Sequence, residues 1–196
     1  MNIIISPFSG QNFSFRSDST LIRILNDYFR PDFVKSVSAC PIVYIKMGKA
    51  GKAFTPCFTN RYLDSFGFGL LLDPELALNK EVKADSNEIF IKNALDYTTI
   101  IPVQKVDFAK YQEFVNSGKF DLALNGHSIF ENKILPKKDQ IIKKISEISE
   151  FLAPRIGDYI AFELDKFILI PEGTHILGTV SYSSVESKTL INLTIH

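Results

Sequence analysis

The sequence predicts an α+β domain in which β-strands predominate, covering residues 1–196 as a single domain. Three observations lead to this prediction. Hydrophobic residues make up 45% of the 196 residues and aromatic residues 12%, which is enough to bury a sizeable core. Short apolar segments bounded by turn residues outnumber segments with helical spacing, and the two kinds do not alternate regularly. No internal repeat or linker-like segment divides the chain.

The expected strands are short apolar runs between turn residues. They are residues 3–5, 41–45, 66–72, 89–91, 97–103, 120–124, 128–130, 159–164, 167–170, 175–182 and 190–195. Gly67 and Gly69 alternate within one of these runs, which predicts that another backbone approaches that strand closely. Asn125-Gly126 predicts a type I′ hairpin, because both turn positions need positive φ. Residues 79–87 are charged and polar, and we expect a solvated excursion there.

Three helices are expected. Apolar residues from Leu21 to Phe29 recur at helical spacing behind Ser19 and Thr20, and Pro31 would end that helix. Asp107 is a candidate N-cap for a short helix that Gly118 would end. The clearest helical face lies in residues 138–152, which Pro154 follows. Its members are Ile141, Ile142, Ile145, Ile148, Phe151 and Leu152.

Composition argues against several classes of function. Lys+Arg and Asp+Glu both number 22, so the net charge is zero and no basic stripe indicates a nucleic-acid partner. No apolar run approaches the length of a membrane span, and residues 1–5 read as a strand rather than a signal peptide. Cys40 and Cys57 lack the spacing of a zinc site or a disulfide framework. We interpret them as reduced thiols of a cytoplasmic protein.

Several motifs occur in an order that resembles the fumarylacetoacetate hydrolase family, in its short bacterial form. Residues 120–162 read as a strand, an Asn-Gly turn, an amphipathic helix, an Ile-Gly-Asp turn and another strand. That order is similar to the L-x-x-N-G hairpin, helix and Gly-Asp turn in the C-terminal half of the family. Residues 41–46, 61–69 and 91–96 resemble further family motifs. The resemblance covers residues 40–196, with 1–39 as a preceding strand–helix segment, and it implies a rolled or barrel-like mixed sheet.

The resemblance also implies a metal site, and here the sequence departs from the family. Family members hold Mg²⁺ or a similar ion with a Glu-x-Glu pair and an Asp, and the ion stabilises the enolate of an oxo-acid or diketo-acid substrate. No acidic residue lies between Lys46 and Arg61, so we infer that the strand bearing the pair is deleted. Leu71 stands where the family's Asp falls. Phe162-Glu163-Leu164-Asp165 replaces the Thr-Gly-Thr-Pro loop, and the N-terminal His motif is absent.

Two acidic pairs remain as substitute metal ligands: Asp73 with Glu75, and Glu163 with Asp165. Asp73-Pro74-Glu75 is more typical of a helix or turn start, and Asp165-Lys166 of a hairpin tip. We therefore expect no metal cofactor, with Mg²⁺ or Mn²⁺ as the alternative.

A ligand pocket, if present, is expected from the residues that replace the family's site. They are Lys92, Phe68, Leu71, Phe162 and Glu163. Lys92 is either an anion-binding group or the exposed end of a strand, and the second interpretation is favoured.

Other motifs point to no chemistry. His127 and His175 each follow a turn, at a solvated strand start, and no G-x-S-x-G nucleophile motif is present. Gly48-Lys49-Ala50-Gly51-Lys52 resembles a phosphate loop but lacks its spacing and following helix, so we interpret it as a flexible basic loop.

Three alternative functions are compatible with the sequence. The favoured one is a degenerate fumarylacetoacetate hydrolase-like protein without the metal site, a non-catalytic binding or assembly protein. The second is a metal-dependent hydrolase, isomerase or decarboxylase of oxo-acids or diketo-acids with a rebuilt metal site. The third is a purely structural or interaction protein. We expect a homodimer, from the resemblance and from 17 Phe in a neutral chain. We expect no nucleic-acid or membrane partner, and the sequence does not identify a small-molecule ligand.

Overall fold

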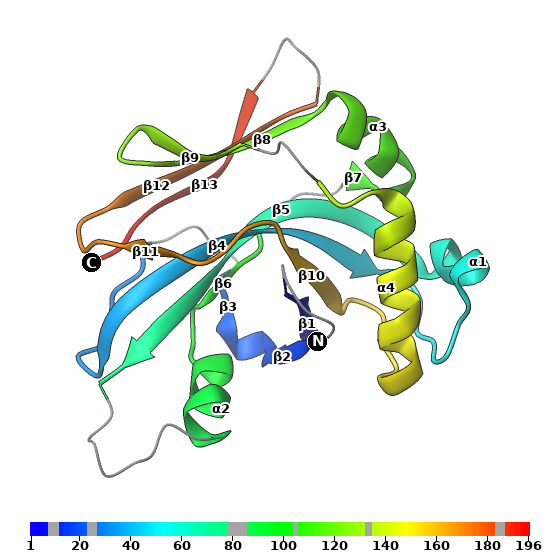
Figure 1. Ribbon diagram of the computed structural model, residues 1–196, viewed down its shortest axis with the longest axis horizontal. Helices are drawn as coiled ribbons and strands as arrows, with labels where there is room; N and C mark the ends of the chain where they lie inside the picture. The colour runs from blue at the N-terminus through cyan, green and yellow to red at the C-terminus, as the bar shows by residue number, and fades with distance from the viewer. Residues whose placement is uncertain (8–11, 23–26, 78–85, 104–105, 132–134, 183–186) are drawn as a thin grey trace.

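Two β-sheets are the main elements of the fold (Figure 1). The computed structural model describes the chain except residues 8–11, 23–26, 78–85, 104–105, 132–134 and 183–186. The larger sheet contains β1 (Asn2–Ser6), β2 (Ser14–Ser17), β3 (Leu21–Ile22), β4 (Val34–Met47), β5 (Leu63–Leu76), β6 (Thr99–Ile100), β7 (Val106–Asp107), β10 (Tyr159–Glu163) and β11 (Ile168–Ile170). The smaller sheet contains β8 (Lys119–Leu124), β9 (His127–Glu131), β12 (His175–Ser181) and β13 (Ser187–Thr194). The predominance of strands confirms the predicted fold class.

The larger sheet curls until its two edges nearly meet. Its order is β2-β1-β10-β4-β5-β6-β3, with β11 also pairing with β4 and β7 with β5. The edge strands β2 and β3 are joined by a single 3₁₀ turn, η1 (Asp18–Thr20), so this short link brings the edges together. The pairs β1–β10 and β3–β6 are parallel and the other pairs are antiparallel. The predicted barrel-like mixed sheet is therefore confirmed.

The two longest strands, β4 and β5, form an antiparallel pair at the centre of this sheet. Ile42 pairs with Gly69 and Tyr44 with Gly67. A Cβ atom on Gly69 would collide with the carbonyl oxygen of Ile100 on β6, which confirms the predicted close approach of another backbone. At Gly67 the space is filled by the hydroxyl end of Tyr44 instead.

The helices lie around the sheets. They are α1 (Pro56–Thr59), α2 (Ser86–Ala94), α3 (Tyr111–Ser117) and α4 (Lys138–Phe151), with 3₁₀ turns η2 (Asn60–Tyr62) and η3 (Phe108–Lys110). The predicted Asp107 cap is confirmed, since its Oδ1 accepts a hydrogen bond from the Ala109 backbone N–H at 2.8 Å. Gly118 ends α3 as predicted. Within the described residues, no helix combines the length and apolar character needed to span a membrane.

Helix α4 confirms most of its predicted apolar face. Ile141, Ile145 and Ile148 are completely buried. Phe151 was expected to face the core but is 70% exposed, because it is the last residue of the helix and the chain turns away after it.

Sheet pairing overrides several local predictions. Leu21 and Ile22 form β3 rather than the start of a helix, because they pair in parallel with Thr99 and Ile100; residues 24 and 25 lie outside the described chain. The strand expected at 97–103 is reduced to β6. The excursion predicted at 79–87 lies mostly outside the described residues.

Three further predictions are corrected. Residues 89–91 lie in helix α2 rather than in a strand, and their apolar side chains are 40–74% exposed. Asp73-Pro74-Glu75 continues β5 rather than starting a turn, because each residue is registered against β4. Asp165-Lys166 is not a hairpin tip: it links β10 to β11, which pair with successive parts of β4 instead of with each other.

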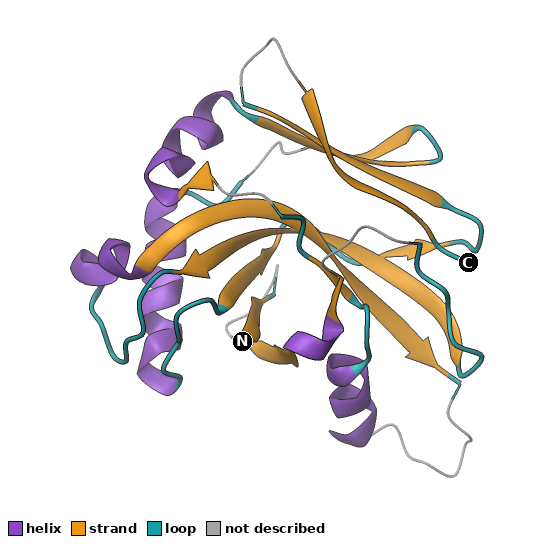
Figure 2. Ribbon diagram, turned by 180° about the vertical axis from the view of Figure 1, so that it is seen from behind, coloured by secondary structure: helices purple, strands orange, loops and turns teal. Residues whose placement is uncertain are grey.

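Figure 2 shows the smaller sheet lying over one side of the curled sheet. Two apolar clusters result from this arrangement. The larger cluster lies between the outer face of the curled sheet, the smaller sheet and α4. The smaller cluster fills the inner face of the curl. The inner face is the concave surface on which a site of the predicted kind would lie.

Candidate functional site

The inner face of the curled sheet is mainly apolar. Side chains alternate between the two faces along each strand, and eight buried residues belong to the inner cluster: Ile3, Ile5, Leu21, Ile42, Tyr44, Leu71, Ile101 and Ala161. Leu71, which stands where a ligating Asp was expected, is completely buried among them. Tyr44 closes one part of this face, with its hydroxyl donating to the carbonyl of Pro102 at 2.9 Å.

One cation is buried against this face. Arg16 on β2 pairs with Ile3 and is only 4% exposed. Its Nη1 donates to the Thr98 carbonyl at 2.8 Å and to Thr99 Oγ1 at 3.3 Å. Among the described residues, its Nε has no hydrogen-bond partner. Burial lowers the pKa of Arg16 to about 10, and the nearby negative charges of Asp73 and Glu163 oppose that shift.

A second cation links two carboxylates at the same end of the curl. Lys92 on α2 lies 3.7 Å from Asp73 Oδ2 and 3.7 Å from Glu88 Oε1. Lys92 is therefore not the exposed end of a strand, since its side chain is only 22% exposed and it joins α2 to β5. Asp73 is two residues beyond Leu71 on β5 and so lies on the same face.

Glu163 and Cys40 complete this group. Glu163 ends β10 opposite Ile42, and Cys40 pairs with Leu71. The Cys40 Sγ donates to the carbonyl of Asp165 at 3.1 Å. Burial, reinforced by the charge of Glu163, raises the pKa of Cys40 to about 12, so this thiol stays protonated at neutral pH.

The structure brings some of the predicted site residues together and separates others. Leu71, Asp73, Glu163 and Lys92 converge on the inner face. Phe68 and Phe162 pack into the larger cluster on the opposite face of the sheet, where the Phe68 ring stacks on Phe120 at a centroid distance of 4.7 Å.

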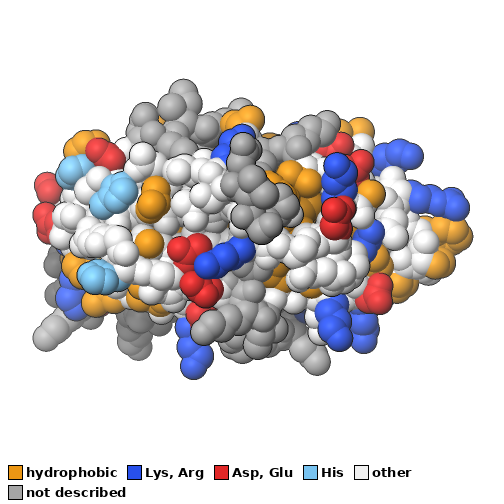
Figure 3. All heavy atoms as spheres, turned by 90° about the horizontal axis from the view of Figure 1, so that it is seen from above, with side chains coloured by type: hydrophobic (Ala, Val, Ile, Leu, Met, Phe, Trp, Pro, Cys, Tyr) orange, Lys and Arg blue, Asp and Glu red, His pale blue; other side chains and the backbone are white. Residues whose placement is uncertain are grey.

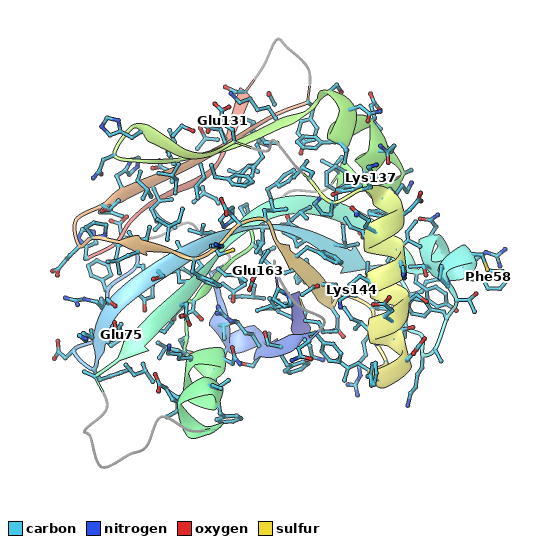
Figure 4. All side chains as sticks on the ribbon, in the orientation of Figure 1. Phe58, Glu75, Glu131, Lys137, Lys144 and Glu163 are labelled. Atoms are coloured by element: carbon cyan, nitrogen blue, oxygen red, sulfur yellow. The ribbon has the colours of Figure 1, made fainter. Side chains whose placement is uncertain are left out.

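Glu75 and Asp165 lie toward the edge of this group. Figure 4 places Glu163 near the middle of the fold and Glu75 at the outer end of the β4–β5 hairpin. Glu75 accepts hydrogen bonds from Ser36 Oγ at 2.7 Å and Lys35 Nζ at 2.9 Å, and these bonds lower its pKa. The Asp165 Oδ1 accepts from the backbone N–H of Lys166 at 2.8 Å.

Arg16, Glu88 and Cys40 are site residues that the sequence did not identify. Arg16 lies in a short polar segment with no motif. Its burial is caused by the curl of the sheet, which brings β2 beside Thr98 and Thr99, 82 and 83 residues away. Glu88 directly precedes the residues that were expected to form a strand, and only the helical spacing from Glu88 to Lys92 would have indicated the pair.

The interval that was expected to have lost the Glu-x-Glu strand is a connection between β4 and β5. Residues 48–62 form a loop followed by α1 and η2. Met47 and Leu63, at its two ends, pair with each other.

Comparisons with known proteins identify the fold. No family model and no curated protein matches the chain. A fumarylacetoacetate hydrolase family protein from Yersinia pestis matches with a TM-score of 0.72 and 18% identity, over 100% of this chain and 92% of that one. Fumarylpyruvate hydrolase from Pseudomonas aeruginosa, solved with Mn²⁺ and pyruvate, matches with a TM-score of 0.75 and 10% identity, over 100% and 90%. Maleylpyruvate hydrolase from Sphingobium matches with a TM-score of 0.72 and 15% identity, over 100% and 70%. The chain therefore has the fold of the fumarylacetoacetate hydrolase family proteins.

The residues on the inner face do not fit the divalent ion that this fold implies. A hard dication needs several oxygen ligands converging on it. Within the part of the chain that the structure describes, no three His, Cys, Asp or Glu side chains group in a way that would hold a metal ion. Asp73 and Glu88 instead converge on the ammonium group of Lys92.

Proposed function

We propose that this chain is a degenerate fumarylacetoacetate hydrolase-like protein that acts as a non-catalytic binding or assembly protein, without the metal chemistry of the fold. One observation carries the proposal: the inner face is packed with apolar side chains around Leu71, and its carboxylates lie beside the protein's own cations.

The charge arrangement supports this proposal. Carboxylates that bind a dication normally have no cationic side chain as a partner. The charge of the bound ion itself offsets their mutual repulsion and their desolvation. Here Lys92 lies 3.7 Å from each of two carboxylates, and Arg16 lies in the field of Asp73 and Glu163. A metal ion would have to approach two fixed positive charges before it reached those oxygens.

Mn²⁺ calorimetry together with an oxaloacetate and acylpyruvate assay tests this proposal. We expect no saturable Mn²⁺ binding in the micromolar range and no turnover above background, with or without EDTA. Micromolar affinity and EDTA-sensitive turnover, both abolished by Asp73→Asn or Glu163→Gln, would instead establish a rebuilt metal site.

The alternative function is that of a metal-dependent hydrolase, isomerase or decarboxylase of oxo-acids. Its supporting observation is the gathering of Asp73, Glu88 and Glu163 at one end of the inner face, close to Arg16 and Lys92. Replacing Lys92 by Met would release two carboxylates. If this variant gained Mn²⁺ affinity that Lys92→Arg lacked, the ammonium group would be what blocks the ion.

We also propose that the protein is a cytoplasmic homodimer. Exposed aromatic side chains support self-association, including Phe29 at 72%, Phe33 at 51% and Phe15 at 46% exposure. The two free thiols support a reducing compartment. Sedimentation equilibrium at about ten micromolar, a range that separates stable dimers from weak ones, would give twice the 22.1 kDa chain mass, whereas a strict monomer would contradict the dimer.

A further inference from the structure

A cleft lies in the connection between β4 and β5, at the end of the molecule that carries α1. It is an open cleft of about 630 Å³, and small-molecule sites typically have volumes of roughly 300–1,000 Å³. Its walls include three cations, Lys49, Lys52 and Arg61, and three aromatic rings, Phe54, Phe58 and Tyr62. The cleft is separate from the inner face, so a ligand bound in it would be independent of the proposed function.

The wall of this cleft is held in place by the protein backbone. Gly48 and Lys49 N–H groups both donate to the Tyr62 carbonyl, at 2.7 and 3.2 Å. Gly51 N–H donates to Pro154 and Ala53 N–H to Ser149, at 3.1 and 2.8 Å. Ala53 has a φ of +49°, a left-handed conformation that costs a non-glycine residue energy and is maintained by these contacts. The loop therefore has a defined shape.

These backbone bonds also show how the loop differs from a phosphate loop. In a phosphate loop the amide groups point at the anion. Here the N–H groups of Gly48, Lys49, Gly51 and Ala53 donate hydrogen bonds to carbonyl oxygens of the protein itself. An anion in this cleft would be bound by side chains.

The charges of the cleft are unbalanced. Lys49, Lys52 and Arg61 line it, and no Asp or Glu is among its lining residues. Within the described chain, none of the three cations forms an ion pair. The nearby Asp64 accepts a hydrogen bond from Ser65 Oγ at 3.0 Å and is not part of the lining. In a chain of zero net charge, this is a local excess of positive charge, which favours an anionic ligand.

The aromatic residues that line the cleft favour a ligand that also has an apolar, planar part. Phe54 and Tyr62 stack on each other at 4.3 Å, forming a firm surface. Phe58 is 47% exposed, and the guanidinium of Arg61 lies 4.8 Å from the centre of its ring. Figure 4 shows Phe58 projecting from α1 at the edge of the molecule. Figure 3 shows Lys and Arg side chains beside hydrophobic ones at that end.

We propose that this cleft binds a small organic phosphate whose remaining part is aromatic, such as a nucleoside monophosphate. A phosphate monoester carries close to two negative charges and three acceptor oxygens, which matches several cations around one space. Arg61 supplies a planar guanidinium that can donate two parallel hydrogen bonds to phosphate. The aromatic group would lie against the exposed ring of Phe58.

Isothermal titration of the full chain with adenosine monophosphate tests this proposal, with adenosine, inorganic phosphate and succinate as comparison ligands. We expect saturable binding of adenosine monophosphate that weakens as salt is added, weaker binding of inorganic phosphate, and none of adenosine or succinate. Lys52→Gln and Arg61→Gln should each weaken the complex about tenfold, the effect of losing one charged hydrogen bond. Phe58→Leu should weaken the binding of adenosine monophosphate and leave the affinity for inorganic phosphate unchanged.

Lys188→Gln is the matched control, because Lys188 is an exposed cation on β13 and does not line the cleft. Thermal melting of each variant confirms that it is folded. The proposal is overturned if adenosine monophosphate shows no saturable binding, or if Lys188→Gln weakens it as much as Lys52→Gln does. Equal affinity for inorganic phosphate and adenosine monophosphate would overturn the aromatic part of the ligand assignment.

Discussion

The carbonyl oxygen of Ile100 occupies the space that a Cβ atom on Gly69 would need. Because β6 hydrogen bonds to β5 at this point, with Leu70 paired to Ile100, neither backbone is free to withdraw. The close approach connects the long hairpin to the strand pair that ends the curled sheet.

Replacing Gly69 by Ala should therefore destabilise the fold. Overpacking against backbone typically costs about 1–3 kcal/mol, and urea unfolding followed by circular dichroism would measure it. Gly126→Asn is a suitable control, since Gly126 has a φ of +83° that Asn tolerates and no atom of the described residues lies within 4 Å of its Cβ position. A Gly69→Ala protein as stable as the control would contradict the close approach.

The buried face of α4 can be tested with a charge. Ile145 is completely buried, and an unpaired carboxylate there costs several kcal/mol, about the whole stability of a domain. Ile145→Asp should yield unfolded or insoluble protein, whereas Phe151→Asp, on the same helix at a position 70% exposed, should remain folded. A soluble Ile145→Asp protein with a cooperative melt would refute the assigned face.

Arg16 should contribute to stability through its buried hydrogen bonds. Arg16→Met removes the donors to Thr98 and Thr99 and the buried positive charge near Asp73 and Glu163. The expected loss is on the order of 1.5–3 kcal/mol, measured by urea unfolding. Arg16→Lys keeps the charge and should recover part of the loss; if both variants matched the parent protein, the network would have no stabilising role.

The Cys40 thiol predicts how stability changes at alkaline pH. Its pKa is raised to about 12 in the folded chain from an ordinary value near 9. The folded state thus holds its proton where the unfolded state has lost it. This contribution to stability is complete below about pH 9 and disappears as the pH rises toward 12.

Cys40→Ser should reduce this alkaline loss, because serine keeps a hydroxyl donor but does not ionise in that range. Urea midpoints at several pH values between 8 and about 11 would measure the difference. Cys57→Ser is the matched control, since Cys57 is exposed. An unchanged pH profile in Cys40→Ser would mean that other groups cause the alkaline loss.

Local sequence signals predicted the elements whose structure is decided locally. The Asn125-Gly126 hairpin has the positive φ values it required, +48° and +83°, and α4 has the expected periodicity. Where pairing between distant strands determines the secondary structure, local sequence signals predicted the wrong element. Leu21 was expected to begin a helix, yet Leu21 and Ile22 pair with β6, 78 residues further along the chain. Ile89-Phe90-Ile91 had strand-like composition, yet it lies in α2, where all three side chains are exposed.

The same distinction applies to the inner face. Leu71 could be singled out from the sequence, because one motif position is enough to identify it. The grouping of Arg16, Lys92 and Glu163 could not, because these residues lie on three elements, β2, α2 and β10, that meet only when the sheet curls. Phe68 and Leu71 illustrate the limit: three positions apart on one strand, they lie on opposite faces.

The parallel pairing of β1 with β10 has a consequence for the order in which the protein assembles. The backbone N–H of Asn2 donates to Asp158 Oδ1 across 156 residues of chain. During translation, β1 is made on the order of ten seconds before its partner β10. Ile3, Ile4 and Ile5 must wait through that interval with only β2 beside them. The inner face of the curl can close only after β10 has been made, so β1 reaches its final neighbours long after it has itself been made.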